Sequence, residues 1–211
     1  MAQISASVWS ADLSNLESEV KKMEKYVDSF HFDVGDGHFI QNLLFFPDLI
    51  ASLRKKTKLP FEVHLMVNNP ENFINAFEDS ADLISFHPNS TSNAKKLIKL
   101  IQKKNIKVGI IINTNEKIEN LKDLICIVDK VTLMGTKLGV KGQNFNKKVL
   151  SKISKVKNIL KNKKSTLIEI DGGIREETIE KMFESGADSV VAGSLIFNEN
   201  YKKMSKWIHN L

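Results

Sequence analysis

Short apolar segments alternate with longer segments of helical spacing along the whole chain, and this alternation limits the folds that the sequence can adopt. Strands are predicted at residues 4–8, 30–34, 61–67, 83–87, 107–112, 129–134, 167–171 and 189–193. Helices are predicted after them, at residues 11–26, 47–56, 69–78, 93–104, 118–125, 146–161, 176–185 and 200–209. Short buried strands joined by helices form parallel sheets. Eight such pairs in 211 residues favour an α/β fold with a single domain, a (β/α)8 TIM barrel over residues 1–211, rather than a doubly wound open sheet.

The composition argues against a membrane or secreted protein. Hydrophobic residues make up 42% of the chain, and no apolar run reaches the roughly 18 residues that a membrane helix needs. The first residues lack the basic and apolar segments of a signal peptide. A single cysteine, Cys126, excludes an internal disulfide, so a reducing cytoplasm is the expected location. Because Cys126 follows Leu124 and Ile125, it is predicted to be buried.

The net charge of +6 raises the question of nucleic-acid binding. Only Arg54 and Arg175 among the 31 basic residues are arginines, although arginine dominates specific base readout. The lysines are spread along the predicted helices and no aromatic residues are interleaved with them as stacking partners. A solvated lysine surface is therefore expected, without a nucleic-acid partner.

Polar side chains collect where the predicted strands end, which is where (β/α)8 barrels place their catalytic groups. These ends carry Ser7, His31, Asp33, His64, His87, Met134, Asp171 and Gly193. His31 and Asp33 are two apart on one strand and project from the same face. Together with His64 and Asp171 they form a set of two histidines and two carboxylates, which suits Zn²⁺, Fe²⁺, Mn²⁺ or Co²⁺.

Two of these histidines have less specific interpretations. Taken alone, His64 would be interpreted as a core histidine that is hydrogen-bonded beneath a loop. The presence of His31, Asp33 and Asp171 at neighbouring strand ends favours its interpretation as a metal ligand. His87 could contact a substrate or could be a hydrogen-bonded residue at the barrel rim, and the sequence leaves both open.

Glycines follow the last two predicted strands, in the loops that often bind phosphate in such barrels. Gly172 and Gly173 follow the seventh strand, and Gly193 and Ser194 follow the eighth. Gly142, after the sixth strand, could add a third wall. Glycine is common in turns of every kind, so it is the position of these glycines after the last strands that indicates a phosphate site.

At this point the sequence resembles the ribulose-phosphate 3-epimerase family over essentially its whole length. The resemblance rests on ISAS at residues 4–7, SADL at 10–13, HFDVGDGHF at 31–39, HLMV at 64–67, DGG at 171–173 and VAGS at 191–194. It implies a barrel of the ribulose-phosphate binding type, acting on a small ketose phosphate and assembled as a homo-oligomer.

The resemblance also implies a role for each matching residue. A divalent metal ion would be held by His31, Asp33, His64 and Asp171, with Asp33 and Asp171 as the catalytic acid/base pair. The substrate-binding residues would be Ser7, His64, Met66, Gly139, Gly142, Gly172, Gly173, Gly193 and Ser194. Two carboxylates can epimerise a carbon next to a ketone without a redox cofactor, through a cis-enediolate. D-ribulose 5-phosphate and D-xylulose 5-phosphate are the implied pair.

Two departures from the family pattern concern the substrate. Gly35 stands where the family usually has a methionine that packs toward the intermediate, which predicts a larger or wetter site. Residues 134–143 keep Met134, Gly139, Gly142 and Gln143 of the family's usual MSVNPGFGGQ, but lose its proline and phenylalanine and gain two lysines.

Two alternatives stay open on this basis, and the sequence argues against a third. One is an epimerase of another ketose phosphate, such as D-allulose 6-phosphate. A second is a phosphosugar-binding barrel without turnover. Orotidine-phosphate decarboxylase, a third phosphate-binding barrel, needs an Asp-x-Lys-x-x-Asp motif, and no Asp-x-Lys occurs in the chain.

Overall fold

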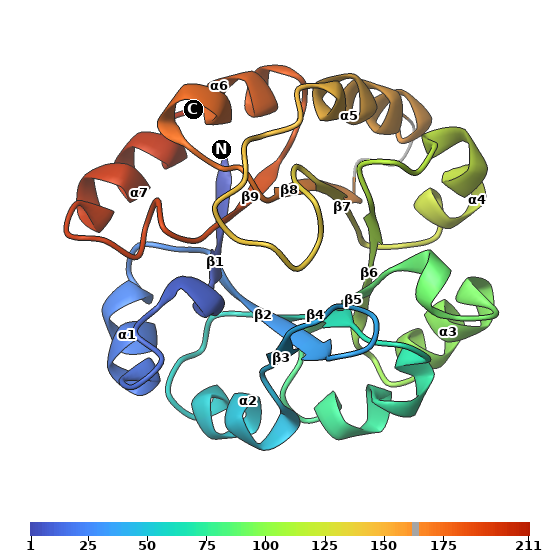
Figure 1. Ribbon diagram of the computed structural model, residues 1–211, viewed down its shortest axis with the longest axis horizontal. Helices are drawn as coiled ribbons and strands as arrows, with labels where there is room; N and C mark the ends of the chain where they lie inside the picture. The colour runs from blue at the N-terminus through green and yellow to red at the C-terminus, as the bar shows by residue number, and fades with distance from the viewer. Residues whose placement is uncertain (162–164) are drawn as a thin grey trace.

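The computed structural model describes residues 1–161 and 165–211, and it contains a closed barrel of eight parallel strands surrounded by helices (Figure 1). The strands of the barrel are β1 (Gln3–Ser7), β2 (Ser29–Asp36), β4 (Phe61–Met66), β5 (Leu83–Phe86), β6 (Lys107–Ile112), β7 (Lys130–Met134), β8 (Leu167–Asp171) and β9 (Ser189–Ala192). The helices are α1 (Leu16–Met23), α2 (Pro47–Arg54), α3 (Ala94–Gln102), α4 (Lys122–Ile125), α5 (Lys148–Ile159), α6 (Glu176–Glu184) and α7 (Tyr201–His209). Because β1 pairs in parallel with both β2 and β9, the ring closes, and the predicted (β/α)8 fold is confirmed.

The main apolar core lies between the barrel and the helices, while the inside of the barrel is largely polar. In β2, Phe30, Phe32 and Val34 belong to the buried apolar cluster, whereas His31 and Asp33 point the other way. A similar alternation recurs in most strands, although β6 presents Gly109 and Ile111 rather than polar residues on its inner face. This division brings the polar strand ends together.

The helices follow from local sequence signals. In α3, Leu97, Ile98 and Ile101 are buried on one face, and the Asn93 side chain caps the helix by accepting a hydrogen bond from the Lys96 backbone N–H at 3.0 Å. In α2, Pro47 occupies the first turn, where its missing N–H costs no helical hydrogen bond.

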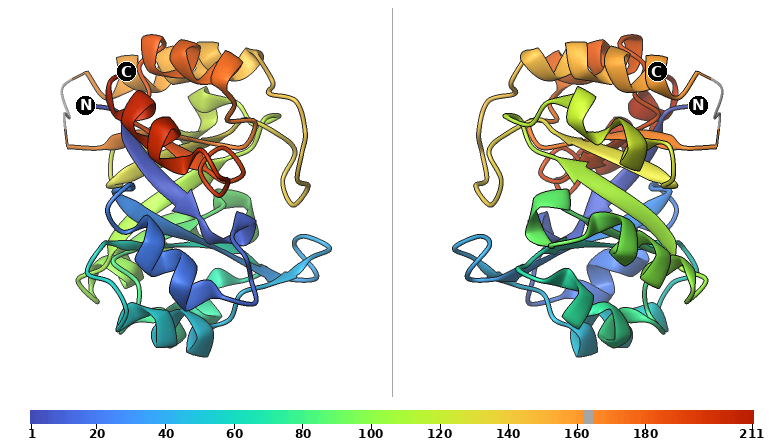
Figure 2. Two further views of the ribbon diagram at one scale, coloured as in Figure 1. Left: turned by 90° about the vertical axis from the view of Figure 1, so that its left-hand side faces the viewer. Right: turned by 90° about the vertical axis from the view of Figure 1, so that its right-hand side faces the viewer.

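A short hairpin extends β2 beyond the predicted strand. Residues up to Asp36 pair antiparallel with β3 (Leu43–Leu44), which the sequence did not predict. The Asp36 carboxylate stabilises the turn by accepting backbone hydrogen bonds from His38 and Phe39, at 2.8 and 2.7 Å. The hairpin and the long loop between β7 and α5 project from the same end of the barrel (Figure 2).

The predicted helix at residues 11–26 is shorter than expected. The Asp12 carboxylate accepts hydrogen bonds from the backbone and hydroxyl groups of Ser14 and from the Asn15 amide, forming a turn that delays α1 until Leu16. Leu13, which the helical spacing included, is 53% exposed.

Two other predicted helices are partly wound as 3₁₀ turns. The helix expected at residues 69–78 consists of the turns Pro70–Asn72 and Ile74–Phe77, and the one expected at 118–125 begins with the turn Ile118–Leu121 before α4. A 3₁₀ turn rises about 2.0 Å per residue, compared with about 1.5 Å in an α-helix, so a short connection can return along the barrel.

The prediction that Cys126 is buried is wrong. Its side chain is exposed, because it follows the single turn of α4, in which Leu124 and Ile125 face the core and the next residue turns outward. In the described ranges 1–161 and 165–211, no helix has the length and apolar character needed to cross a membrane.

Candidate active site

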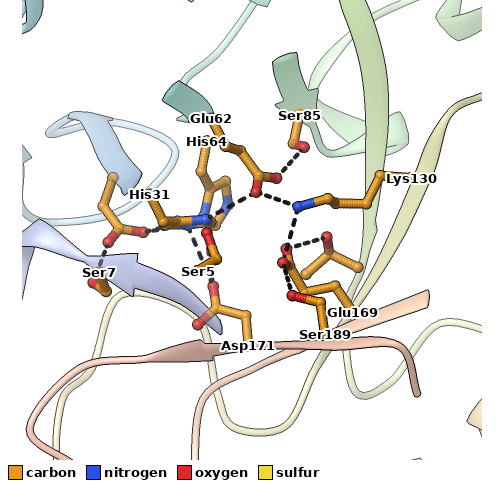
Figure 3. Close-up of polar contacts among 12 residues, drawn as sticks. Ser5, Ser7, His31, Glu62, His64, Ser85, Lys130, Glu169, Asp171 and Ser189 are labelled. Atoms are coloured by element: carbon orange, nitrogen blue, oxygen red, sulfur yellow. Dashed lines mark hydrogen bonds and ion pairs between the residues drawn. The ribbon is translucent and has the colours of Figure 1, made fainter. Parts of the chain in front are cut away.

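Four side chains from three strands meet at the C-terminal end of the barrel (Figure 3). His31 and Asp33 come from β2, His64 from β4 and Asp171 from β8. His31 Nε2 lies 3.3 Å from both His64 Nδ1 and Asp33 Oδ1, and His64 Nδ1 lies 3.2 Å from Asp33 Oδ1. Asp171 Oδ2 is 3.8 Å from His31 Nε2 and 3.7 Å from His64 Nδ1. The structure therefore gathers the four residues that the sequence singled out as metal ligands.

The donor atoms have the spacing of a tetrahedral metal site. Four ligands about 2.05 Å from a Zn²⁺ ion would be about 3.3 Å from one another in a regular tetrahedron. The separations that involve His31 or His64 run from 3.2 to 3.8 Å, and all four donor atoms lie within 4.8 Å of one another. Two ring nitrogens and two carboxylates converging on one point suit a divalent cation, so the residues present fit the group.

Burial and mutual proximity shift the pKa values of the cluster in different directions. Burial raises the pKa of Asp171 to about 7, opposed by His31 and reinforced by Asp33. Asp33 is also buried, yet the neighbouring His31 and His64 hold the pKa of its carboxyl well below the usual range. For His31, burial lowers the pKa, but the carboxylates of Asp33 and Glu62 outweigh it and the net pKa is raised. Burial is thus the main reason that the pKa of Asp171 is raised, and the charge of Asp33 adds to it.

A second buried polar cluster lies one layer deeper in the barrel (Figure 3). The Lys130 ammonium donates to Glu62 Oε2 at 2.7 Å and to Glu169 Oε2 at 2.9 Å. Ser85 donates to the other oxygen of Glu62 at 2.6 Å, and Ser189 donates to Glu169 at 2.8 Å. Glu62 Oε2 also lies 3.4 Å from His31 Nδ1, so the deeper cluster adjoins the metal-site histidine.

A cleft of about 350 Å³ opens above the four converging residues. Every residue predicted to bind substrate lines it: Ser7, His64, Met66, Gly139, Gly142, Gly172, Gly173, Gly193 and Ser194. Asp33 and Asp171 line it as well, while His31 lies fully buried beneath. Ser7 donates a hydrogen bond to Asp33 Oδ2 at 3.0 Å, which fixes that carboxylate at the cleft floor.

Several lining residues were not predicted from the sequence: Trp9, Ser10, Thr136, Lys137, Lys141 and Arg175. All of them lie within a few residues of a predicted strand end or glycine, so a wider window at each strand end would have included most of them. His87, whose role was open, is fully buried between His64 and Phe39 and does not line the cleft.

The loop after β8 requires glycine for its shape. Gly172 and Gly173 have φ angles of 92° and 73°, in the region that other residues rarely adopt. A β-carbon on Gly172 would lie 2.3 Å from Thr136 Oγ1, and one on Gly173 would lie 2.8 Å from the Phe145 backbone. These glycines allow the β8 loop and the loop after β7 to pack closely beside the cleft.

The space beside Gly35 is occupied. A β-carbon there would lie 2.7 Å from the Asn42 carbonyl oxygen and 2.9 Å from Ile40 Cδ1. Ile40, from the hairpin after β2, is only 7% exposed. The hairpin thus supplies an apolar side chain beside Gly35, although neither residue lines the cleft, and the larger or wetter site stays a prediction.

Fold and site together define a (β/α)8-barrel enzyme with a cation-compatible centre at its strand ends. A model of the "Ribulose-phosphate 3 epimerase family" matches residues 3–197. The chain belongs to this family, and it is therefore an enzyme of the isomerase class.

Individual relatives agree with this assignment. The chain is 36% identical over 207 residues to ribulose-phosphate 3-epimerase of Bacillus subtilis (strain 168), covering 96% of this chain and 95% of that protein. It is 37% identical over 202 residues to ribulose-phosphate 3-epimerase of Methanocaldococcus jannaschii, covering 95% and 86%.

Solved structures show the same fold at low identity. A crystal structure of 3-hexulose-6-phosphate synthase superposes with a TM-score of 0.70 at 17% identity, covering 99% of this chain and 98% of that one. Orotidine 5'-phosphate decarboxylase from Pyrococcus horikoshii OT3 gives a TM-score of 0.68 at 16% identity, covering 98% and 97%. At such identities the likeness establishes the barrel alone.

Proposed function

We propose that this protein is a metal-dependent sugar-phosphate 3-epimerase that interconverts D-ribulose 5-phosphate and D-xylulose 5-phosphate. The observation that carries the proposal is that Asp33, at the end of β2, and Asp171, at the end of β8, converge on His31 and His64 at the floor of the cleft. The family membership and the names of the relatives support the choice of substrates.

In this proposal, proton transfer at C3 is the work of the two carboxylates. Epimerisation removes the C3 proton from one face of the substrate and returns a proton to the other face, through a cis-enediolate. The Asp33 carboxylate, which is ionised because His31 and His64 hold its pKa low, would accept the proton on one face, and Asp171 would return a proton on the other face. The two exchange roles in the reverse direction.

A divalent cation would be held by His31, Asp33, His64 and Asp171. When bound, it would supply positive charge where negative charge develops on the substrate oxygens. Ser7 would keep the Asp33 carboxylate oriented through its hydrogen bond, and Met66 would form part of the apolar wall.

The phosphate group would occupy the other end of the cleft, beside Gly172 and Gly173 and beside Gly193 and Ser194. The glycine backbones can approach an anion closely because they carry no side chain, and α6 begins just beyond the β8 loop. Gly139 and Gly142 would close the site from the loop after β7.

The test is a substrate panel with the metal-loaded protein, following epimer formation from pentulose 5-phosphates and hexulose 6-phosphates. We expect the highest kcat/KM with D-ribulose 5-phosphate and D-xylulose 5-phosphate. Preference for D-allulose 6-phosphate would replace the substrate but keep the reaction class. Tight phosphosugar binding without any C3 exchange would replace the epimerase with a binding barrel. The identity of the metal, homo-oligomeric assembly and cytoplasmic location stay predictions.

A further inference from the structure

A loop of residues 135–147, between β7 and α5, crosses the end of the barrel (Figures 1 and 2), and its residues 136–143 line the cleft. Neighbouring segments hold it at two sides of the mouth. A β-carbon on Gly139 would lie 3.2 Å from Ile40 of the hairpin, and Arg175 Nη2 donates to the Gly142 carbonyl at 3.4 Å. Between these two glycines, Lys141 reaches across to the segment that follows β1.

The Lys141 ammonium has one strong anchor and unused donors. It donates a hydrogen bond to the Trp9 carbonyl oxygen at 2.6 Å and lies 4.4 Å from the centre of the Trp9 ring. An ammonium group has three N–H donors, so two are left for a ligand. Among residues 1–161 and 165–211, no carboxylate forms an ion pair with Lys141, in contrast to the surface lysines Lys21 and Lys155.

The anchor places this charge beside the segment against which the Gly193 loop packs. A β-carbon on Gly193 would lie 2.4 Å from Ser10 Oγ, so the loop after β9 packs against the residue next to Trp9. Burial lowers the pKa of Lys141, and the charge of Asp33 partly opposes this effect.

We propose that Lys141 is a specificity-determining residue that binds the phosphate group of the substrate directly, through the N–H donors that its contact with Trp9 leaves free. The inference rests on the proposed function and adds a side-chain cation to the backbone groups described there. Its chemical target is a phosphomonoester dianion, for which a lysine ammonium is a compact point charge. Trp9 holds the ammonium in place before the ligand arrives, so little side-chain entropy is lost on binding.

The first experiment measures binding of inorganic phosphate to the metal-loaded protein by calorimetry. Lys141→Met should weaken phosphate binding by about 10- to 100-fold, the range expected for a hydrogen bond between charged groups. Lys141→Arg, which keeps the charge, should restore most of the affinity. Lys147→Met is the matched control: it removes an exposed lysine of the same loop that does not line the cleft, and it should leave the affinity within about twofold. Equal affinities for the Lys141→Met and Lys147→Met variants would overturn the proposal.

A second experiment separates phosphate contact from a role in merely closing the loop. With a phosphorylated ketose, Lys141→Met should raise KM by about the same 10- to 100-fold and change kcat little. With the same ketose lacking its phosphate, kcat/KM should be unchanged, since the lost contact is absent from that complex. An equal loss with both ketoses would mean that Lys141 only closes the loop, and would overturn the phosphate contact.

The calorimetric result does not depend on turnover. A protein that epimerises no ketose phosphate, yet loses phosphate affinity in the Lys141→Met variant, would refute the proposed function and support this contact. If the protein epimerises D-ribulose 5-phosphate and the Lys141→Met variant has an unchanged KM, the result would support the proposed function and refute the Lys141 contact.

Discussion

The Nε2 atoms of His64 and His87 lie 2.9 Å apart inside the barrel. At this distance one of the two nitrogens must donate a hydrogen bond and the other must accept it. The opposite nitrogen of His64, Nδ1, is 3.2 Å from Asp33 Oδ1 within the metal-compatible cluster, where a cation would require its lone pair. The tautomer of His64 that suits a cation therefore carries its proton on Nε2 and makes His87 the acceptor. Burial, followed by the effect of His64, holds the pKa of His87 well below its usual range and keeps this acceptor neutral.

We predict that His87→Ala lowers the affinity for divalent metal by about 10- to 100-fold, the usual effect of removing the partner of a metal-ligating histidine. His87→Gln keeps an acceptor at about the position of Nε2 and should lose less. Competition with a chromophoric chelator measures both values, and melting temperatures identify unfolded variants. An unchanged affinity in the His87→Ala variant would show that His64 needs no partner for its tautomer.

Metal affinity should depend steeply on pH. In the metal-free protein, Asp171 holds a proton below about pH 7, and His31, whose pKa is raised, holds one to higher pH. Metal binding must displace both protons, so affinity should fall as the pH is lowered: by about tenfold per unit for each proton displaced, with the steeper slope below pH 7. Chelator competition between pH 6 and 8.5 gives this slope.

An Asp171→Asn variant provides the control for that slope. It has no carboxyl proton to displace, so the slope below pH 7 should decrease by one proton, although the affinity itself falls at every pH. The same slope in both proteins would place the displaced proton on a group other than Asp171.

Isotope exchange at C3 tests the two-base mechanism. Asp33→Asn and Asp171→Asn should each abolish net epimerisation, since general acid–base groups contribute about 10²- to 10⁴-fold and both residues are also proposed ligands. With one base left, each variant should still exchange the C3 proton of one epimer with D₂O. Each epimer is incubated with each variant, and deuterium at C3 is read by NMR. Only variants with full metal content are compared, and equal exchange from both epimers would favour a single base serving both faces.

Strand ends could be predicted from the sequence because side chains alternate along a strand and parallel strands end at the same edge. That rule alone placed His31 and Asp33 beside His64 and Asp171. Helix ends were less predictable, because side-chain hydrogen bonds compete with the helix. The apolar spacing at residues 11–26 is regular, but the Asp12 turn takes the first residues out of α1.

The deeper polar layer was missed although the same rule applies to it. Glu62 stands two residues before His64, and Glu169 two before Asp171, so both must point into the barrel. Contacts that depend on loop conformation lie beyond any such rule. Neither the filling of the space at Gly35 by Ile40 nor the anchoring of Lys141 on Trp9 follows from sequence spacing, because each joins segments whose relative position only the folded chain defines.

Lys130 offers a prediction for this deeper layer. Its ammonium is buried between Glu62 and Glu169, and removing one partner of a buried ion pair leaves uncompensated charge. Lys130→Met keeps a side chain of similar length and should lower the free energy of unfolding by about 3–5 kcal/mol. Lys155→Met, which breaks the exposed pair of Lys155 with Glu119, is the matched control and should change it little. Denaturant titrations of both variants measure the difference.

The cause of that loss can be tested by pH and by a second substitution. Burial, reinforced by Glu62, already raises the pKa of Glu169 in the intact protein, and without Lys130 it should rise further. A carboxyl group with a raised pKa in the folded state binds more protons there than in the unfolded chain, so the Lys130→Met variant should become more stable as the pH falls from 8 to 5. Lys130→Met combined with Glu169→Gln removes the Glu169 charge that Lys130 compensates, and should recover part of the stability at pH 8. If the single variant is as stable as the Lys155→Met control at pH 8, the two buried glutamates do not depend on Lys130 for their charge balance.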